Sequence, residues 1–280
     1  MALRATKYEP LQHRIIFKSP VTRAQLGTLV TEVIKHVLYD RERLPMPFDQ
    51  FKKFLRDTWS SDSLNMHETV MQQLSRNQER KAVESFNALD HALSTISDMV
   101  QQNQVHEIRF MIGSTYVTPS EQYLIRVPHE PTCEECGNSR GLRQCLLDMM
   151  STLMNCSAGQ PPLPSSEKVM TFLRTKRRHV PRDIMELHQD FHVPWLGKIW
   201  EFDFVLKTCP HAAESADGKV SADSGSECSG GEVPSQGGNQ LEHGHDKVSS
   251  DVEDTVVWAR IKNVFPKIEM QTFSRRDGAF

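Results

Sequence analysis

The clearest candidates for metal chemistry lie in the stretch HEPTCEECGNSRGLRQC, as one histidine and three cysteines: His129, Cys133, Cys136 and Cys145. Three thiolates and one imidazole could together hold a zinc ion. A single C-x-x-C pair without a second one is a weak signal for such a site, and Cys145 falls inside a predicted helix. The alternative is a polar surface turn that happens to contain two thiols. A small zinc-dependent enzyme would depend wholly on this loop, and we expect no bound metal and no cofactor.

Motifs that mark common catalytic sites are absent from the sequence. It contains no phosphate-binding GxxxxGK[ST] loop, no GxSxG elbow, no HExxH and no paired-glycine dinucleotide fingerprint. The twelve histidines are scattered, mostly among polar neighbours. We therefore expect a protein that is not an enzyme.

The length of 280 residues suits one large domain or two small ones. No apolar run approaches the roughly 18 residues of a membrane-spanning helix, and the start of the chain lacks the apolar centre of a secretory signal. We expect neither a membrane protein nor a secreted one. Six cysteines are too few for a disulfide scaffold, which favours reduced thiols in a nuclear or cytosolic setting.

The net charge of −3 conceals a strongly acidic segment. Residues 208–254 contain ten acidic residues and two lysines, a net charge of −8, so the remainder carries +5. The segment is rich in Gly and Ser and has no Phe, Trp or Tyr. Such a composition cannot bury enough apolar area to offset the entropy of ordering it. We predict a disordered insertion at 208–254, a flexible N-terminus at 1–12, and one domain formed by 13–207 and 255–276.

A basic run, TKRRHVPR, covers residues 175–182. It could act as a nuclear localisation signal or contact an acidic partner. Runs of this kind are more often solvated loops. The mildly basic remainder is too weakly charged to indicate nucleic acid as a partner.

Apolar residues at steps of three and four predict three long helices. The first follows a capping box formed by Thr22 and Gln25, and ends before Pro45. The second spans roughly residues 78–101 and the third roughly 139–156. The segment FDQFKKFLRD indicates a further short helical piece, and residues 57–78 a loop.

Alternating apolar residues predict some six to eight strands. They fall at about residues 15–17, 108–112, 123–127, 200–206, 256–262 and 264–273. Helices together with strands that are concentrated late in the chain favour an α+β fold over a doubly wound parallel sheet.

Several blocks of the sequence resemble one known family in their order along the chain. The block RIIFKSPVTRAQLGTLVTEVIKHVLYDRERLPMPFDQFKKFLRD is similar to the first helix region of the comet family, the Mad-two-binding proteins of the spindle checkpoint. The block AVESFNALDHALSTISDMVQQNQVHEIRFMIGSTYVTPSEQY resembles the next region, and LRQCLLDMM followed by QPPLP also fits. FHVP and the tail VVWARIKNVFPKIEMQTFSRR match more loosely, and the acidic insertion is unmatched.

The resemblance implies a HORMA fold: three helices packed on an antiparallel sheet, with C-terminal strands that resemble a safety belt. It also implies a non-enzymatic adaptor, a monomer when free, that binds closed Mad-two and presents it to a Pch-two-type AAA+ ATPase for conversion to the open form. That activity would silence the spindle assembly checkpoint and promote mitotic exit. The implied locations are the nucleus, the cytoplasm and the mitotic spindle, with neither nucleic acid nor membrane as a partner.

The resemblance also assigns candidate site residues. The partner-binding positions would be Leu146 on the third helix and Asp40 at the end of the first, where the family has an aromatic residue and an amide. Arg143 and Met150 lie on the same helix surface as Leu146. The alternative is that Leu146 faces the core while Gln144 and Asp148 face water. A second contact, with the ATPase, would fall near two further residues, Leu187 and His188.

A different function remains open beside the adaptor. A HORMA protein of another checkpoint or of a meiotic pathway could capture a peptide under a true safety belt. The tail distinguishes the two, because residues 264–273 packed against their own sheet would already fill the peptide groove.

Overall fold

The computed structural model describes residues 10–60, 70–129, 139–157, 160–164, 166–194, 196–207, 254–262 and 268. Within these ranges the chain forms four helices, a short 3₁₀ turn and seven strands. The helices are α1 (Arg23–Asp40), α2 (Phe48–Ser60), α3 (Val70–Gln101) and α4 (Ser139–Ser157), and the 3₁₀ turn is η2 (Arg177–His179). The strands are β1 (Leu11–Ile16), β2 (Val105–Gly113), β3 (Pro119–Arg126), β4 (Lys168–Lys176), β5 (Met185–Leu187), β6 (Lys198–Val205) and β7 (Val256–Ile261).

The strands form one sheet in the order β1-β6-β3-β2-β4-β7-β5. The predicted α+β class is confirmed, but the prediction of an antiparallel sheet is wrong at one side. Strand β6 runs parallel to both β1 and β3, whereas β2, β4, β7 and β5 pair antiparallel to their neighbours. Alternation of apolar residues indicates a buried face and carries no information on strand direction, which explains the error.

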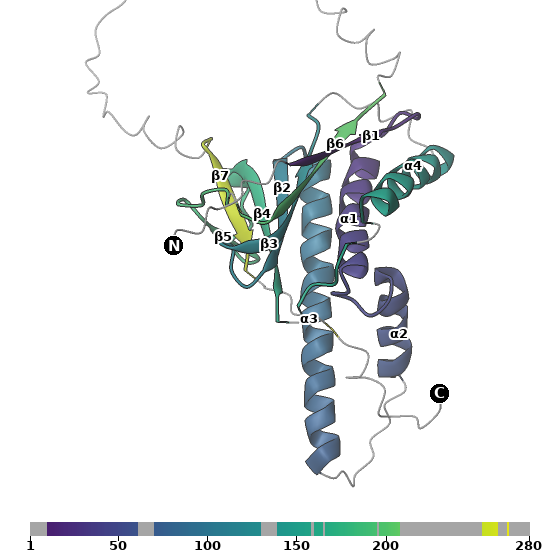
Figure 1. Ribbon diagram of the computed structural model, residues 1–280, viewed down its shortest axis with the longest axis vertical. Coiled ribbons are helices and arrows are strands. Elements are labelled where there is room, and N and C mark those ends of the chain that lie inside the picture. Colours follow the sequence, from purple (N-terminus) through teal and green to yellow (C-terminus); the bar gives the residue numbers. More distant parts are fainter. Residues whose placement is uncertain are drawn as a thin grey trace, which may run out of the picture.

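The helices gather on one side of the sheet, with α3 and α1 next to the strands and α2 and α4 further out (Figure 1). Helix α1 begins as its sequence predicts. The N–H of Gln25 donates to the Thr22 hydroxyl, and the Gln25 side chain accepts from the Thr22 N–H. This capping box satisfies two of the N–H groups that a helix start leaves unpaired.

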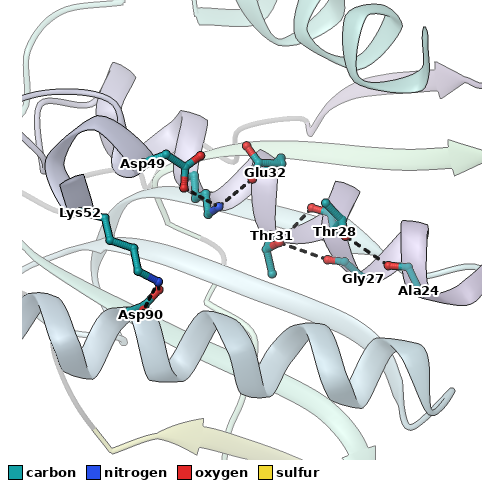
Figure 2. A network of polar contacts seen from close by, with 9 residues as sticks. Ala24, Gly27, Thr28, Thr31, Glu32, Asp49, Lys52 and Asp90 are labelled. Atoms are coloured by element: carbon teal, nitrogen blue, oxygen red, sulfur yellow. Dashed lines mark hydrogen bonds and ion pairs between the residues drawn. The ribbon is translucent and has the colours of Figure 1, made fainter. Parts of the chain in front are cut away.

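Helices α1 and α3 approach closely at a glycine. A Cβ placed on Gly27 would lie 2.8 Å from both the backbone oxygen and the Oγ of Ser97. Helix α2 is joined to α3 by an ion pair between Lys52 and Asp90. The Lys52 Nζ lies 2.7 Å from a carboxylate oxygen of Asp90 (Figure 2). Helix α3 therefore contacts both α1 and α2 directly.

Helix α3 begins eight residues earlier than its apolar pattern predicts. The pattern starts near residue 78, whereas the helix starts at Val70, and its first turns extend beyond the sheet (Figure 1). Residues 70–78, VMQQLSRNQ, are mostly good helix formers without an apolar stripe. Periodicity therefore could not reveal this part of the helix. The family-implied count of three helices is also exceeded, because the short helical piece predicted after Pro47 is a full helix, α2.

Two apolar clusters lie on the two faces of the sheet. The main core fills the space between the helices and the sheet. The smaller one, on the other face, is formed by Met111, Met170, Phe172 and Phe191 and is bordered by Tyr116 and Trp258. No helix in the described residues is both long and apolar enough to cross a membrane.

The predicted domain boundaries largely fall outside the described residues. Residues 1–9 and 208–253 are not among the described residues, so both the flexible N-terminus and the insertion stay predictions. Of the predicted strand 264–273 only Ile268 is described. It is buried in the main core, and its N–H donates to the carbonyl of Arg43 at 3.0 Å. The tail therefore packs against the turn after α1 at this point.

Candidate partner-binding surface on the fourth helix

Helix α4 attaches to the domain through a conventional apolar face. Cys145, Met149 and Leu153 are fully buried and recur at steps of four residues. They pack toward α1 and β1, so α4 lies at the β1 side of the molecule (Figure 1).

The opposite face of α4 carries exposed apolar side chains. The side chains of Leu147 and Met154 are 58% and 63% exposed, although both are large and apolar. Arg143 is exposed and Met150 half-buried on the same side. These four residues follow one another at spacings of four, three and four, which aligns them along one face of a helix. We call Arg143, Leu147, Met150 and Met154 the α4 stripe.

A groove borders the α4 stripe where α4 meets α1 and the start of α2. Its volume is about 640 Å³. Met150 and Met154 line it from the α4 side, and Asp40 and Tyr39 from the end of α1. The other lining residues are Glu32, Lys35, His36, Pro47, Phe48 and Asp49.

Both acidic and apolar side chains line the groove. Lys35 is the one lysine among the described residues that line it. Its Nζ lies 2.7 Å from Glu32 and 3.3 Å from Asp49, and 4.9 Å from the centre of the Phe48 ring. Burial opposes the charge on Lys35, but the two carboxylates outweigh it and raise the pKa of the amine. With Asp40 as the third carboxylate and neutral His36, the described lining residues carry a net charge of −2.

His36 is a polar group without a hydrogen bond at one nitrogen. Its Nε2 is buried and has no partner among the described residues. Burial lowers the pKa of the imidazole, and the nearby Asp40 carboxylate opposes that effect only in part. The ring is therefore neutral at physiological pH.

The end of α1 is fixed by a buried ion pair directly after Asp40. The Arg41 guanidinium donates to both carboxylate oxygens of Glu121 on β3, at 2.8 and 2.5 Å, and to the carbonyl of Pro161. The Tyr123 hydroxyl donates to the same carboxylate at 2.7 Å. This network holds Asp40 in place at the groove wall.

The residues assigned by resemblance to the partner-binding face are thus only partly brought together. Asp40 and Met150 line one groove, and Arg143 lies on the exposed stripe two turns away. Leu146 borders the stripe but is half-buried against the main core. The sequence reasoning missed Leu147 and Tyr39. Leu147 could have been found as an apolar residue beside Gln144 and Asp148, the two polar residues that the sequence places on the water-facing side of this helix.

The candidate zinc ligands fall in two different environments. Cys145 is buried in the core, its Sγ lies 3.9 Å from the Ser19 carbonyl, and burial raises the pKa of its thiol. His129 is bonded through Nδ1 to Asn103, and its ring contacts the His106 ring at a tilt of 45°. Cys133 and Cys136 lie outside the described residues. In the part of the chain that is described, no three potential ligands are grouped as a metal site.

The two residues assigned to an ATPase contact lie on the other side of the molecule from α4 (Figure 1). Leu187 ends β5, the last strand at the edge opposite β1, and packs against the main core. The ring of His188 packs edge-on against Tyr116 and Phe172, and the backbone N–H of His188 donates to the Trp258 carbonyl. Both residues are therefore anchored in the domain.

An α+β domain with exposed apolar side chains along one helix, beside an open groove, has the features of a protein-interaction module. Comparison with known proteins identifies its family. A sequence model of the p31comet family, described as Mad1 and Cdc20-bound-Mad2 binding, matches residues 4–161, more than half of the chain. The chain belongs to the p31comet family, which confirms the resemblance noted from its sequence.

Individual relatives match over a shorter range. The MAD2L1-binding protein of Mus musculus is 27% identical over 109 residues, which are 39% of this chain and 39% of the mouse protein. The MAD2L1-binding protein of Homo sapiens is 26% identical over 109 residues, again 39% of each chain. The matched region thus spans about two fifths of the length of these curated relatives.

Proposed function

We propose that this chain is a non-enzymatic adaptor of HORMA fold that binds closed Mad2 through the α4 stripe and the adjoining groove. It presents closed Mad2 to an AAA+ ATPase for conversion to the open form, and so silences the spindle assembly checkpoint and promotes mitotic exit. Membership of a family described as Mad1 and Cdc20-bound-Mad2 binding supports Mad2 as the partner. A seven-stranded mixed sheet covered by helices is compatible with a Mad2-like fold.

The observation that carries the proposal is the exposure of Leu147 and Met154 on α4. Two large apolar side chains on one helix face, next to a groove lined by Met150, form a patch that association would remove from water. Methionine side chains adapt readily to a partner surface, and a few central anchors supply most of the energy of an interface.

The arrangement of the two candidate surfaces suits an adaptor. The α4 stripe is at the β1 side of the domain, and Leu187 and His188 are at the β5 side. Partners bound at these two sides would not compete for the same surface. The adaptor could therefore contact Mad2 and the ATPase at the same time.

The alternative, a HORMA protein that captures a peptide in another checkpoint or a meiotic pathway, needs a vacant groove for that peptide. The burial of Ile268 in the core of its own domain favours the adaptor instead, because at least one residue of the tail is already bound internally. The proposed locations are the nucleus, the cytoplasm and the mitotic spindle, which imaging of the tagged chain through mitosis would test.

A pull-down with closed Mad2 tests the proposed face. Leu147→Asp should abolish recovery, because a carboxylate desolvated in an apolar interface has no partner there. Val117→Asp is the matched control, since Val117 is 60% exposed in the loop between β2 and β3. Undiminished recovery of Leu147→Asp would refute the assignment of the face.

A further inference from the structure

Several strands begin or terminate at the same end of the sheet. Strands β6, β3 and β4 end there, and β2 and β7 begin there, because β6 is parallel to β3 while β2 and β7 run the other way. The turn η2 follows β4 at the same end. The residues at these strand ends therefore lie side by side along one end of the sheet, which we call the rim.

Arginine and lysine side chains gather on this rim. Arg174 and Lys176 alternate with the buried Thr175, so both point away from the helix-covered face. Arg177 and Arg178 continue the run into η2. We call Arg174, Lys176, Arg177 and Arg178 the basic edge.

The carboxylates near the basic edge neutralise it only partly. Glu107 is paired mainly with Arg109, at 2.8 Å, and lies at the longer distance of 3.9 Å from Arg174. Further along the rim Arg126 is paired with two acids, Glu201 and Asp203. In the described part of the chain no carboxylate lies within ion-pair distance of the Arg177 guanidinium.

The positive charges of the basic edge contribute to the lowered pKa values of two neighbouring histidines. Burial lowers the pKa of His106, and Arg174 and Lys176 lower it further. Burial also lowers the pKa of His179; Arg178 and Lys176 lower it further, and the Asp254 carboxylate opposes them. The Nδ1 atom of the His179 ring is buried and has no hydrogen-bond partner among the described residues.

One carboxylate from the C-terminal side of the acidic segment already lies on the basic edge. Asp254 is 2.6 Å from Arg178 and 3.7 Å from Lys176. The next residue, Thr255, accepts a hydrogen bond from the N–H of Arg177 at 2.9 Å. Asp254 is the last residue of the segment 208–254, which carries the net charge of −8.

We propose that the basic edge is a binding surface for acidic polypeptide, and that its occupant is the segment 208–253 of the same chain. Both ends of this segment are attached to the same rim, at the end of β6 and at the start of β7. These strands are four positions apart, about 19 Å at a strand spacing of ~4.8 Å. The straight path between them crosses the ends of β3, β2 and β4, and the basic edge lies at the end of β4 and in the adjoining turn η2.

Tethering makes this interaction effective although each exposed ion pair contributes little. A segment attached at both sides of a surface is present there at a local concentration in the ~mM range. An acidic peptide supplied in trans must therefore compete with the segment for the basic edge. The competition weakens as salt screens the charges.

The test uses the full-length chain and a labelled peptide with the sequence LEHGHDKVSSDVED, residues 241–254. In the neutralised variant, nine acids of the segment become amides while Asp254 is kept: Glu214, Asp217, Asp223, Glu227, Glu232, Glu242, Asp246, Asp251 and Glu253. Fluorescence anisotropy at low salt should show that this variant binds the peptide about tenfold or more tightly than the wild type, because the tethered competitor is weakened.

A second pair of variants locates the binding surface. Changing Arg174, Arg177 and Arg178 to Gln in the neutralised chain should abolish peptide binding. Changing Lys53, Arg80 and Lys81 to Gln is the matched control and should preserve it, because these exposed side chains lie on α2 and α3. Unfolding temperatures confirm that each variant is folded. Equal affinity of the peptide for the wild type and the neutralised chain, or equal losses in the two triple variants, would overturn the proposal.

Discussion

The guanidinium of Arg41 and the carboxylate of Glu121 form a buried, two-pronged ion pair that joins the end of α1 to β3. The pair lies next to Asp40, a wall residue of the groove beside the α4 stripe. The Tyr123 hydroxyl completes the site, and burial and the Glu121 charge raise the pKa of that phenol well above its usual range. A surface proposed to contact a partner is thus positioned by a polar network inside the domain.

Removing one member of this pair should be strongly destabilising. In Glu121→Leu the Arg41 charge stays buried without a counter-charge, and we expect a loss of about 3–5 kcal/mol in the free energy of unfolding. Denaturant titration measures it. The double variant with Arg41→Met should recover part of the loss. A Glu121→Leu chain as stable as the wild type would show that the pair is not important for stability.

The contact of α1 with α3 at Gly27 gives a second stability prediction. In Gly27→Ala the added methyl would overlap the Ser97 oxygen atoms, so we expect a loss of about 1–3 kcal/mol despite the better helix propensity of Ala. Adding Ser97→Ala removes the Oγ contact and leaves the backbone oxygen, so it should restore only part of the stability. An increase in unfolding temperature for Gly27→Ala would contradict this packing.

The lowered pKa of His36 predicts a loss of stability in mild acid. The unfolded imidazole takes up a proton near its ordinary pKa of 6.5, whereas the folded one does so only at lower pH. The free energy of unfolding should therefore fall as the pH drops from about 7 to about 5. His36→Gln should show a shallower fall. An equally steep fall in His36→Gln would assign the effect to other groups.

Leu146 and Leu147 are neighbours in sequence with different environments, so the same substitution should have different effects. Leu146→Asp inserts a carboxylate against the main core and should lower the unfolding temperature. Leu147→Asp changes a side chain that is 58% exposed and should leave it almost unchanged. Calorimetry measures the unfolding temperatures of both variants and so tests this difference. Equal melting temperatures would mean that Leu146 does not pack as described.

The local elements follow from the sequence wherever one physical rule dominates. Thr22 and Gln25 predict the start of α1, since a capping box acts within four residues. The buried face of α4 follows from its apolar stripe. The direction of β6 could not be predicted, because pairing with β1 and β3 depends on where distant segments meet.

The candidate surface could be predicted only in part. Resemblance pointed to α4 and to Asp40, and Met150 was included because it lies one turn from Leu146. A helix has several apolar residues near the boundary of its buried face, and only its packing against α1 and β1 determines that Leu147 rather than Leu146 is exposed. The groove needs three helices at once, so no local pattern could show it.

The most direct test of the account is titration calorimetry of the wild-type chain with Mad2 locked in its closed form and, separately, in its open form. We expect a one-to-one complex with closed Mad2, little or no heat with open Mad2, and loss of the complex in Leu147→Asp. Absence of binding to closed Mad2, or binding that persists in Leu147→Asp, would contradict it.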